Sequence, residues 1–179
     1  MMKKYFIILV TFIMISVYSY GQSGLNIGVS FGFPYENYEG YEYSFAFSGD
    51  INYLFEVTPA FSLGLASGYG HAFGRDFYLG WPINGVFETP DYQYVPVALA
   101  GRVNANRRLV LGADIGYAIS VTSAKDLFNN KYYTGGFYWR PMVGFNLNEK
   151  FQINANYIGI SDDYFYYSVF NIGFSINLN

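Results

Sequence analysis

Four charged residues stand in segments that otherwise alternate between large apolar and small or polar side chains. They are two aspartates and two arginines, Asp50, Asp114, Arg102 and Arg140. Equal numbers of opposite charges in a narrow interior could form an ion-selective constriction or a gate. They could instead form an ion-pair network that closes the interior, because buried charges need partners. We favour the network, and we expect Asp114 and Arg140, at similar heights on neighbouring strands, to pair.

His71 is the only histidine of the chain. A histidine can act as a general base when a nucleophile lies within hydrogen-bond reach. Arg75 and Asp76 are close to His71 in sequence, but no motif supplies a nucleophile at a fixed spacing. We therefore interpret His71 as a polar residue at a membrane interface, and we predict no catalytic residue, no cofactor and no metal centre.

Carboxylates and aromatic residues also gather in segments that read as loops, such as "PYENYEGYEY". Spaced carboxylates could bind Ca²⁺ or Mg²⁺, alternating Tyr and Glu suit protein recognition, and a solvated loop explains them equally well. The longest connector, 72–91, is aromatic and could form a hairpin, cover the barrel mouth or contact a partner. The candidates for surface interaction are Glu36, Tyr38, Glu39, Tyr41, Glu42, Trp81, Asp162 and Asp163.

Eight segments must position these residues, and all eight alternate with period two. In the last, "VFNIGFSINLN", bulky apolar residues alternate with small or polar ones, so a strand there has one apolar and one polar face. Helical spacing fits none of the eight. Pro96 and Pro141 interrupt two of them and predict a bulge, a frayed end or a local break. The segments are 25–33, 43–55, 61–70, 94–103, 109–121, 137–147, 151–160 and 169–179, with Tyr43 assigned to an apolar face.

The connectors alternate in length as well. Those after the second, fourth and sixth segments are short, whereas 34–42, 72–91 and 122–134 are long and 161–166 is intermediate. Short and long connectors therefore fall at opposite ends of an up-and-down sheet. An even number of strands puts both chain ends beside the short turns.

The composition narrows the class of protein. Aromatic residues make up 22% and charged residues only 13%, and the absence of Cys excludes disulfides, thiolate metal sites and a lipid-modified Cys. The first residues have the layout of a signal peptide, with a basic start at Lys3 and Lys4, an apolar run at 5–17 and small residues after it. We predict that this signal peptide is residues 1–22. The remaining 23–179 would form one domain with 8 basic and 13 acidic residues, a net charge of 8 − 13 = −5, which argues against a nucleic-acid partner.

The remaining question is which face points outward. A soluble carrier barrel has its apolar face inside, and a membrane barrel has it outside. An eight-stranded barrel is just wide enough to be filled by side chains, so eight rows of aromatic residues would overfill it while Gly, Ala, Ser and Asn would fit. The four strand charges lie on the small-residue face, and a basic residue facing lipid would cost about 2–4 kcal/mol at the membrane midplane. We predict an all-β, eight-stranded antiparallel up-and-down transmembrane β-barrel.

The signal peptide, the eight alternating strands, the three tight turns and the longer opposite loops resemble the small outer-membrane barrels of Gram-negative bacteria, of the OmpX and OmpA membrane-domain type. The "GQ" at the end of the signal and the Tyr- and Asn-rich strands resemble the versions found in Bacteroidetes. Many such barrels end in an aromatic residue, whereas this chain ends Leu178–Asn179.

This resemblance implies several properties of the protein. It implies location in the outer membrane, contact with lipid and lipopolysaccharide, insertion by the assembly machinery and a monomeric state. It also implies a structural or surface-interaction role without an open pore. A small passive channel and a lipid-modifying barrel enzyme are the alternatives.

Overall fold

The computed structural model describes residues 23–37, 42–79, 85–87, 89–122, 135–161 and 166–178, so the predicted signal peptide lies outside the described part. The described residues form ten strands and no helix. Within these ranges no helix is long and apolar enough to cross a membrane. The strands are β1 (Gly24–Asn37), β2 (Glu42–Thr58), β3 (Phe61–Arg75), β4 (Phe77–Leu79), β5 (Gly85–Phe87), β6 (Tyr92–Asn104), β7 (Leu109–Ser120), β8 (Gly135–Asn146), β9 (Phe151–Ser161) and β10 (Tyr166–Asn177).

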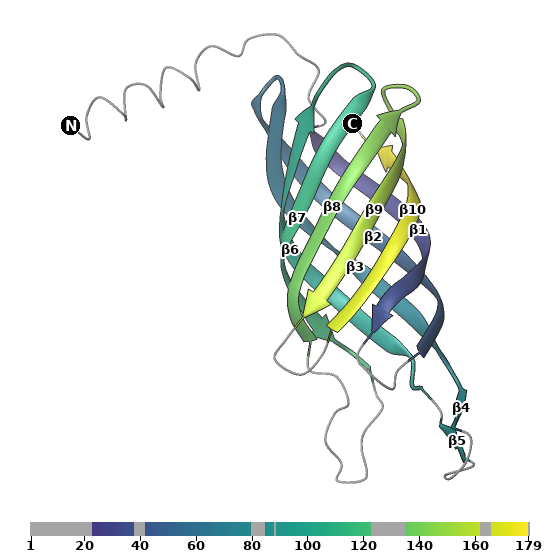
Figure 1. Ribbon diagram of the computed structural model, residues 1–179. Coiled ribbons are helices and arrows are strands. Elements are labelled where there is room, and N and C mark those ends of the chain that lie inside the picture. The colour runs from purple at the N-terminus through teal and green to yellow at the C-terminus, as the bar shows by residue number, and fades with distance from the viewer. Residues whose placement is uncertain are drawn as a thin grey trace, which may run out of the picture.

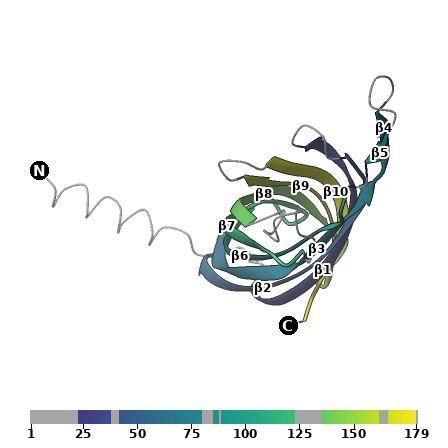
Figure 2. The same ribbon diagram turned by 90° about the horizontal axis from the view of Figure 1, so that it is seen from below.

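Eight of these strands close into one antiparallel barrel in the order β1–β2–β3–β6–β7–β8–β9–β10 (Figures 1 and 2). Pairing of β1 with β10 closes the ring, from Asn26 opposite Asn177 to Asn37 opposite Tyr167. Except across the β4–β5 hairpin, each strand pairs with the next one along the chain. The predicted eight-stranded up-and-down barrel is confirmed.

The barrel has two unlike ends, which we call the short-turn end and the long-loop end. Both described chain ends lie at the short-turn end (Figure 1). Two turns there, 104–109 and 146–151, share the sequence pattern Asn-x-Asn-x-basic-apolar. In each, the side-chain oxygen of the second Asn, Asn106 or Asn148, accepts the backbone N–H groups of the second and third residues after it at 2.8–2.9 Å. An Asn that binds its own backbone in this way favours a tight turn.

Where β10 meets β1, the two strands are joined by the same backbone hydrogen bond that closes these two turns, although no turn connects them. The Leu178 N–H donates to the Leu25 carbonyl at 2.9 Å, and the corresponding backbone bonds inside the two turns measure 2.9 and 2.8 Å. The seam is therefore bonded at its edge as the continuous turns are.

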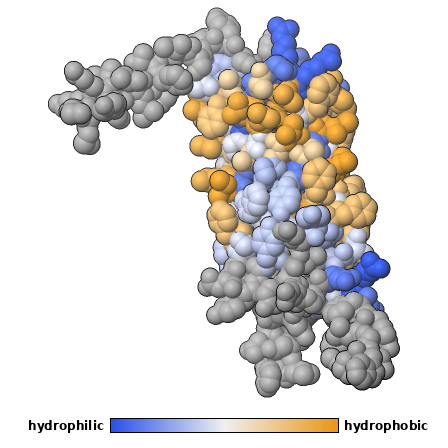
Figure 3. Space-filling model, in the orientation of Figure 1, coloured by the Kyte–Doolittle hydropathy of each residue, from blue (hydrophilic) through white to orange (hydrophobic). Residues whose placement is uncertain are grey.

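The outer wall is apolar and the inner wall carries the polar side chains. Outward-facing residues such as Leu65, Ile172, Phe55 and Leu99 are 60–62% exposed, and hydrophobic residues cover much of the barrel wall in Figure 3. Asn, Ser and charged side chains are buried on the inner face. The face assignment predicted from the sequence is confirmed for the barrel as a whole.

Tyr43 and its neighbour Ser44 depart from the predicted alternation, since Ser44, which the pattern placed on the small-residue face, is exposed. Tyr43 is only 7% exposed and points into the barrel, whereas the sequence pattern assigned it to the lipid face. The β2–β3 register shifts between Tyr43 and Phe45. Such a bulge adds one residue to a strand and reverses the side-chain parity beyond it, so the prediction for Tyr43 was wrong.

At each of the two prolines the structure has a local break in strand pairing, and in the longest connector it has a hairpin, which are among the forms predicted from the sequence. Beside Pro96 the β3–β6 pairing is interrupted and then resumes in the same register, and the Ser67 hydroxyl donates to the Pro96 carbonyl at 2.8 Å. The β8–β9 pairing is interrupted in the same way beside Pro141. Each proline therefore produces a local break on one side of its strand. The connector 76–91 contains the β4–β5 hairpin.

Candidate functional site in the barrel lumen

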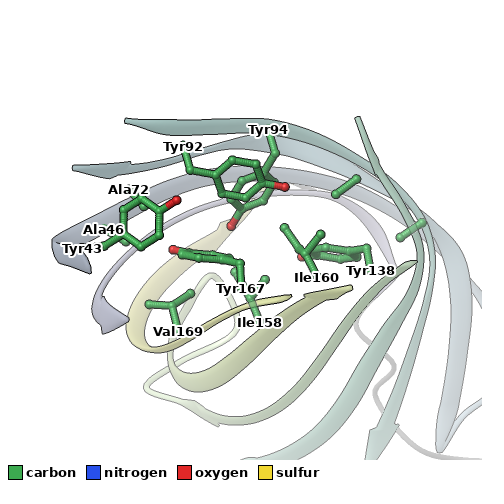
Figure 4. Packing of buried hydrophobic residues seen from close by; sticks show 12 residues of the cluster. Tyr43, Ala46, Ala72, Tyr92, Tyr94, Tyr138, Ile158, Ile160, Tyr167 and Val169 are labelled. Atoms are coloured by element: carbon green, nitrogen blue, oxygen red, sulfur yellow. The ribbon is translucent and has the colours of Figure 1, made fainter. Parts of the chain in front are cut away.

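The long-loop half of the lumen is filled by five tyrosine rings, which we call the tyrosine plug: Tyr43, Tyr92, Tyr94, Tyr138 and Tyr167. Ring centroids lie 5.2 Å apart for Tyr92 and Tyr167, 5.6 Å for Tyr43 and Tyr167, and 6.5 Å for Tyr94 and Tyr138. These are ordinary spacings for edge-to-face and tilted aromatic pairs. Figure 4 shows the rings projecting inward from opposite walls of the barrel.

Small and aliphatic residues complete this packing. Ile158, Ile160 and Val169 are at most 1% exposed and lie among the rings (Figure 4). The Tyr94 ring lies directly over Gly70, where a Cβ atom would overlap ring carbons. The glycine leaves the room that the ring needs, so the long-loop half is packed like a protein core.

A continuous series of ion pairs, which we call the ion chain, lies on the short-turn side of the plug. Its members are Asp50, Arg102, Asp114 and Arg140. Arg102 Nη1 lies 2.5 Å from Asp114 Oδ1, Arg140 Nη2 lies 2.5 Å from Asp114 Oδ2, and Arg140 Nη1 lies 3.1 Å from Asp50 Oδ1. Three of the side chains are at most 5% exposed, and that of Asp50 is 17% exposed. The structure thus brings together the four charges singled out in the sequence.

The strand order explains two of these contacts. Asp114 and Arg140 face each other directly in the β7–β8 ladder. Arg102 is opposite Gly112 in the β6–β7 ladder, two residues from Asp114, and its long side chain extends along the wall. Asp50 is on β2, which does not pair with β8, so its contact with Arg140 crosses the lumen.

Two glycines make room for the ends of the ion chain. A Cβ atom on Gly28 would come within 2.9–3.1 Å of the Asp50 carboxylate. A Cβ atom on Gly112 would come within 2.6 Å of Arg102 Cδ and 2.8 Å of Met142 Cγ. Both charged side chains therefore lie flat against backbone, which a larger residue at either glycine would prevent.

The short-turn half of the lumen is lined by amides and holds a small cavity beside the ion chain. Its water-accessible volume is about 20 Å³, room for about one water molecule. A smaller cavity adjoins it towards the short turns and is bordered by Asn148, Glu149 and Lys150. The larger cavity is lined by Asn26, Asp50, Asn52, Arg102, Arg140, Met142, Gln152, Asn154 and Ser175.

His71 lies on the outer wall near the long-loop end, in a row of three hydrogen-bonded side chains. Its Nε2 is 3.0 Å from Asp91 Oδ2 and its Nδ1 is 3.2 Å from the Tyr69 hydroxyl. Its ring stacks on Phe47 with centroids 5.4 Å apart and lies 4.4 Å from Phe73. Asp91 also accepts the Gly74 N–H at 2.9 Å, so this row joins the end of the 76–91 connector to β3. Sequence reasoning missed Asp91, which is 20 residues from His71.

The loop candidates are mostly outside the described residues. Glu42 is exposed, and its N–H donates to the Thr89 hydroxyl at 3.3 Å. Glu36 belongs to β1, but its side chain lies outside the described part. The other candidates, Tyr38, Glu39, Tyr41, Trp81, Asp162 and Asp163, are also outside it. Among the described residues, no three His, Asp or Glu side chains form a group that could hold a metal ion.

Comparison with solved structures places the fold beside that of a known outer-membrane protein. The crystal structure of Ail, the attachment invasion locus protein of Yersinia pestis, matches with a TM-score of 0.54 and 14% identity over 86% of this chain and 98% of Ail. Ail in a phospholipid bilayer nanodisc matches with a TM-score of 0.49 and 15% identity, over 84% of this chain and 97% of that one. Ail bound to the heparin analogue sucrose octasulfate matches with a TM-score of 0.47 and 16% identity, over 86% and 98%.

No protein-family model and no curated protein sequence matches the chain. At these identities the comparison establishes the fold, an eight-stranded barrel of the small outer-membrane type, as the resemblance predicted. The Bacteroidetes origin stays a prediction.

Proposed function

We propose that this chain is an integral outer-membrane protein of a Gram-negative bacterium with a structural or surface-interaction role and no open pore. The observation that supports it is a closed lumen inside an apolar wall. The tyrosine plug fills one half, the ion chain crosses the middle, and the outer residues are hydrophobic and exposed. A closed barrel leaves no unpaired strand edge facing lipid. On this proposal residues 1–22 are the signal peptide, the assembly machinery inserts the chain, and the barrel is monomeric.

The aromatic residues of the outer wall support a membrane position. At the long-loop end, Trp139 lies 5.0 Å from the Tyr157 ring, and the Tyr157 hydroxyl is 2.9 Å from that of Tyr166. At the short-turn end, the Phe151 and Phe174 rings stack 5.5 Å apart. Aromatic girdles at both interfaces are typical of transmembrane barrels. The long-loop end would then face the cell exterior.

The charge of the long connectors indicates which partners the long-loop end of the barrel would contact. Segments 34–42, 72–91, 122–134 and 161–166 together contain nine acidic and three basic residues, a net charge of 3 − 9 = −6. Such a rim attracts basic partners, or lipopolysaccharide phosphates bridged by divalent cations. It disfavours a polyanion such as the sulfated ligand seen with Ail.

Fractionation and conductance test the proposal. We expect the native protein in the outer-membrane fraction, soluble only with detergent, and migrating differently on an SDS gel before and after boiling. In planar bilayers we expect no discrete conductance steps, because the lumen is filled. Discrete conductance steps from the wild-type protein would favour the passive channel. Native protein that stays dissolved in buffer without detergent would contradict a membrane barrel.

The Tyr69–His71–Asp91 row supplies a specific test of the lipid-modifying alternative. A carboxylate, an imidazole and a hydroxyl in series could activate the phenol as a nucleophile. We expect His71→Ala to leave the lipid A and phospholipid species of the membrane unchanged by mass spectrometry. A change in acyl-chain composition that depends on His71 would instead establish an enzyme.

A further inference from the structure

The ion chain has an unsatisfied cationic end. Its charges alternate in the order Arg102, Asp114, Arg140, Asp50, so Asp114 is shared by two arginines while Arg140 also binds Asp50. Arg102 therefore binds only one oxygen of the Asp114 carboxylate, which it shares with Arg140. The other hydrogen bonds of its Nη1 group go to the backbone carbonyls of Gly101 and Ala113. Among the described residues its Nε and Nη2 groups donate no hydrogen bond, although its side chain is only 3% exposed.

The cavity that Arg102 borders is rich in further donors. The side-chain oxygen of Asn52 accepts from Asn26, and that of Asn154 accepts from Asn156. The NH₂ groups of both amides make no hydrogen bond within the described part of the chain. The Asp50 carboxylate also lines the cavity, where it lies against Gly28 and binds Arg140 through one oxygen.

We propose that this cavity binds a small monovalent anion of chloride size, held by the Arg102 guanidinium and by the amide N–H groups of Asn52 and Asn154. Spare N–H donors on a buried cation prefer an anionic acceptor, and the bonds are charge-assisted. The water-accessible volume of about 20 Å³ admits a water-sized ion and excludes bulky organic anions.

A route to the site runs from the short-turn end. The adjoining cavity shares Asn26, Gln152 and Ser175 with the larger one and is bordered by Lys150 at its outer side. On the other side, the tyrosine plug blocks the way to the long-loop end. The anion would therefore enter and leave through the short-turn half alone.

The test uses the full barrel, refolded in detergent, with sodium chloride exchanged for sodium gluconate at constant ionic strength. We expect the thermal midpoint to rise with chloride and to saturate, because a ligand that binds only the folded state stabilises it by RT ln(1 + [L]/Kd). The ³⁵Cl NMR line should broaden in the presence of the protein and narrow when bromide competes. Equal midpoints in chloride and gluconate, with no broadening, would mean that the cavity holds water only and would overturn the proposal.

Isosteric variants separate the site from general salt effects. Asn154→Asp and, should that variant fail to fold, Asn52→Asp keep the accepting oxygen but replace the free NH₂ by a carboxylate oxygen. Either should abolish the saturable chloride effect while leaving the four charges of the ion chain. Asn106→Asp adds the same charge in a turn outside the cavity, retains the oxygen that caps the turn, and should keep the effect. A chloride response equal in all variants would refute the site.

Discussion

The two halves of the lumen are built on the same strands but are filled in different ways. The long-loop half packs tyrosine and aliphatic side chains that are almost fully buried, and its large rings lie against small residues such as Gly70. The short-turn half is lined by amides and hydroxyls, linked by bonds such as Asn26 Nδ2 to Asn52 Oδ1 at 3.1 Å, and it retains a cavity. One half therefore resembles the core of a soluble protein and the other a solvated cleft.

The difference shows what an eight-stranded barrel needs inside. Dry packing makes the long-loop half rigid, because each side chain there has fixed neighbours. Amides can exchange their partners for water at little cost, so the other half can hold small solutes. The ion chain lies between the two halves and borders the cavity, so its removal should affect both.

The largest effect is expected at the ion chain. Asp114→Ala leaves Arg102 and Arg140 buried without their shared carboxylate, which should lower the free energy of unfolding by about 3–5 kcal/mol. Urea unfolding in lipid vesicles measures it. A double-mutant cycle with Arg140→Ala should show a coupling of about 0.5–3 kcal/mol. Strictly additive losses would mean that the two side chains are not coupled.

The tyrosine plug comes next, and it should contribute more than the amides of the other half. Tyr167→Ala removes a ring that contacts Tyr43, Tyr92 and Tyr94, and we expect a loss of about 3 kcal/mol. Asn26→Ala, which removes one lumen amide, should cost only about 1 kcal/mol. Equal losses in the same urea assay would erase the distinction between the halves.

A matched control refines the prediction for Tyr167. Its hydroxyl has no hydrogen-bond partner among the described residues. Tyr167→Phe should therefore leave the unfolding free energy nearly unchanged, since no hydrogen bond is lost. A loss as large as that of the Ala variant would show that the hydroxyl, rather than the ring, holds the plug.

A smaller effect is expected where the wall makes room for Arg102. The methyl group of Gly112→Ala would overlap Arg102 and Met142, and displacing them should cost about 1–3 kcal/mol. Gly101→Ala, whose Cβ would make only ordinary contacts 3.6–4.0 Å from its neighbours, serves as the control and should be neutral or slightly stabilising. Identical unfolding midpoints for the two variants would exclude a tight fit at Gly112.

The sequence was sufficient for the barrel because period-two alternation reports directly which side chains share a face. It was not sufficient at Tyr43, where a bulge reversed the parity although the bulged residues of β2, Tyr43 to Phe45, include no Gly or Pro. It revealed the plug only in part, because Tyr94 and Tyr138 stand on the small-residue faces of their strands while the aliphatic members of the plug could not be recognised. Ile158 and Val169 face inward in a half whose two faces are both apolar, so hydrophobicity could not distinguish inside from outside.

The contacts of the candidate site were partly accessible from the sequence. Pairing of Asp114 with Arg140 could be proposed because their strands are adjacent. The contact of Asp50 with Arg140 depends on the stagger of the closed barrel, which strand lengths alone do not define. The partnership of His71 with Asp91 depends on how the connector returns to the wall, and no local pattern records that path.

The bond that closes the seam has a topological consequence. Joined directly to Ser23, the final residues would read Asn-Leu-Asn-Ser-Gly-Leu, which repeats the Asn-x-Asn-x-x-apolar spacing of the two continuous turns. The same closed order of strands should therefore form when the break in the backbone is moved to another of the short turns. A circular permutant with that junction, reopened between Glu149 and Lys150, should assemble into the same cylinder.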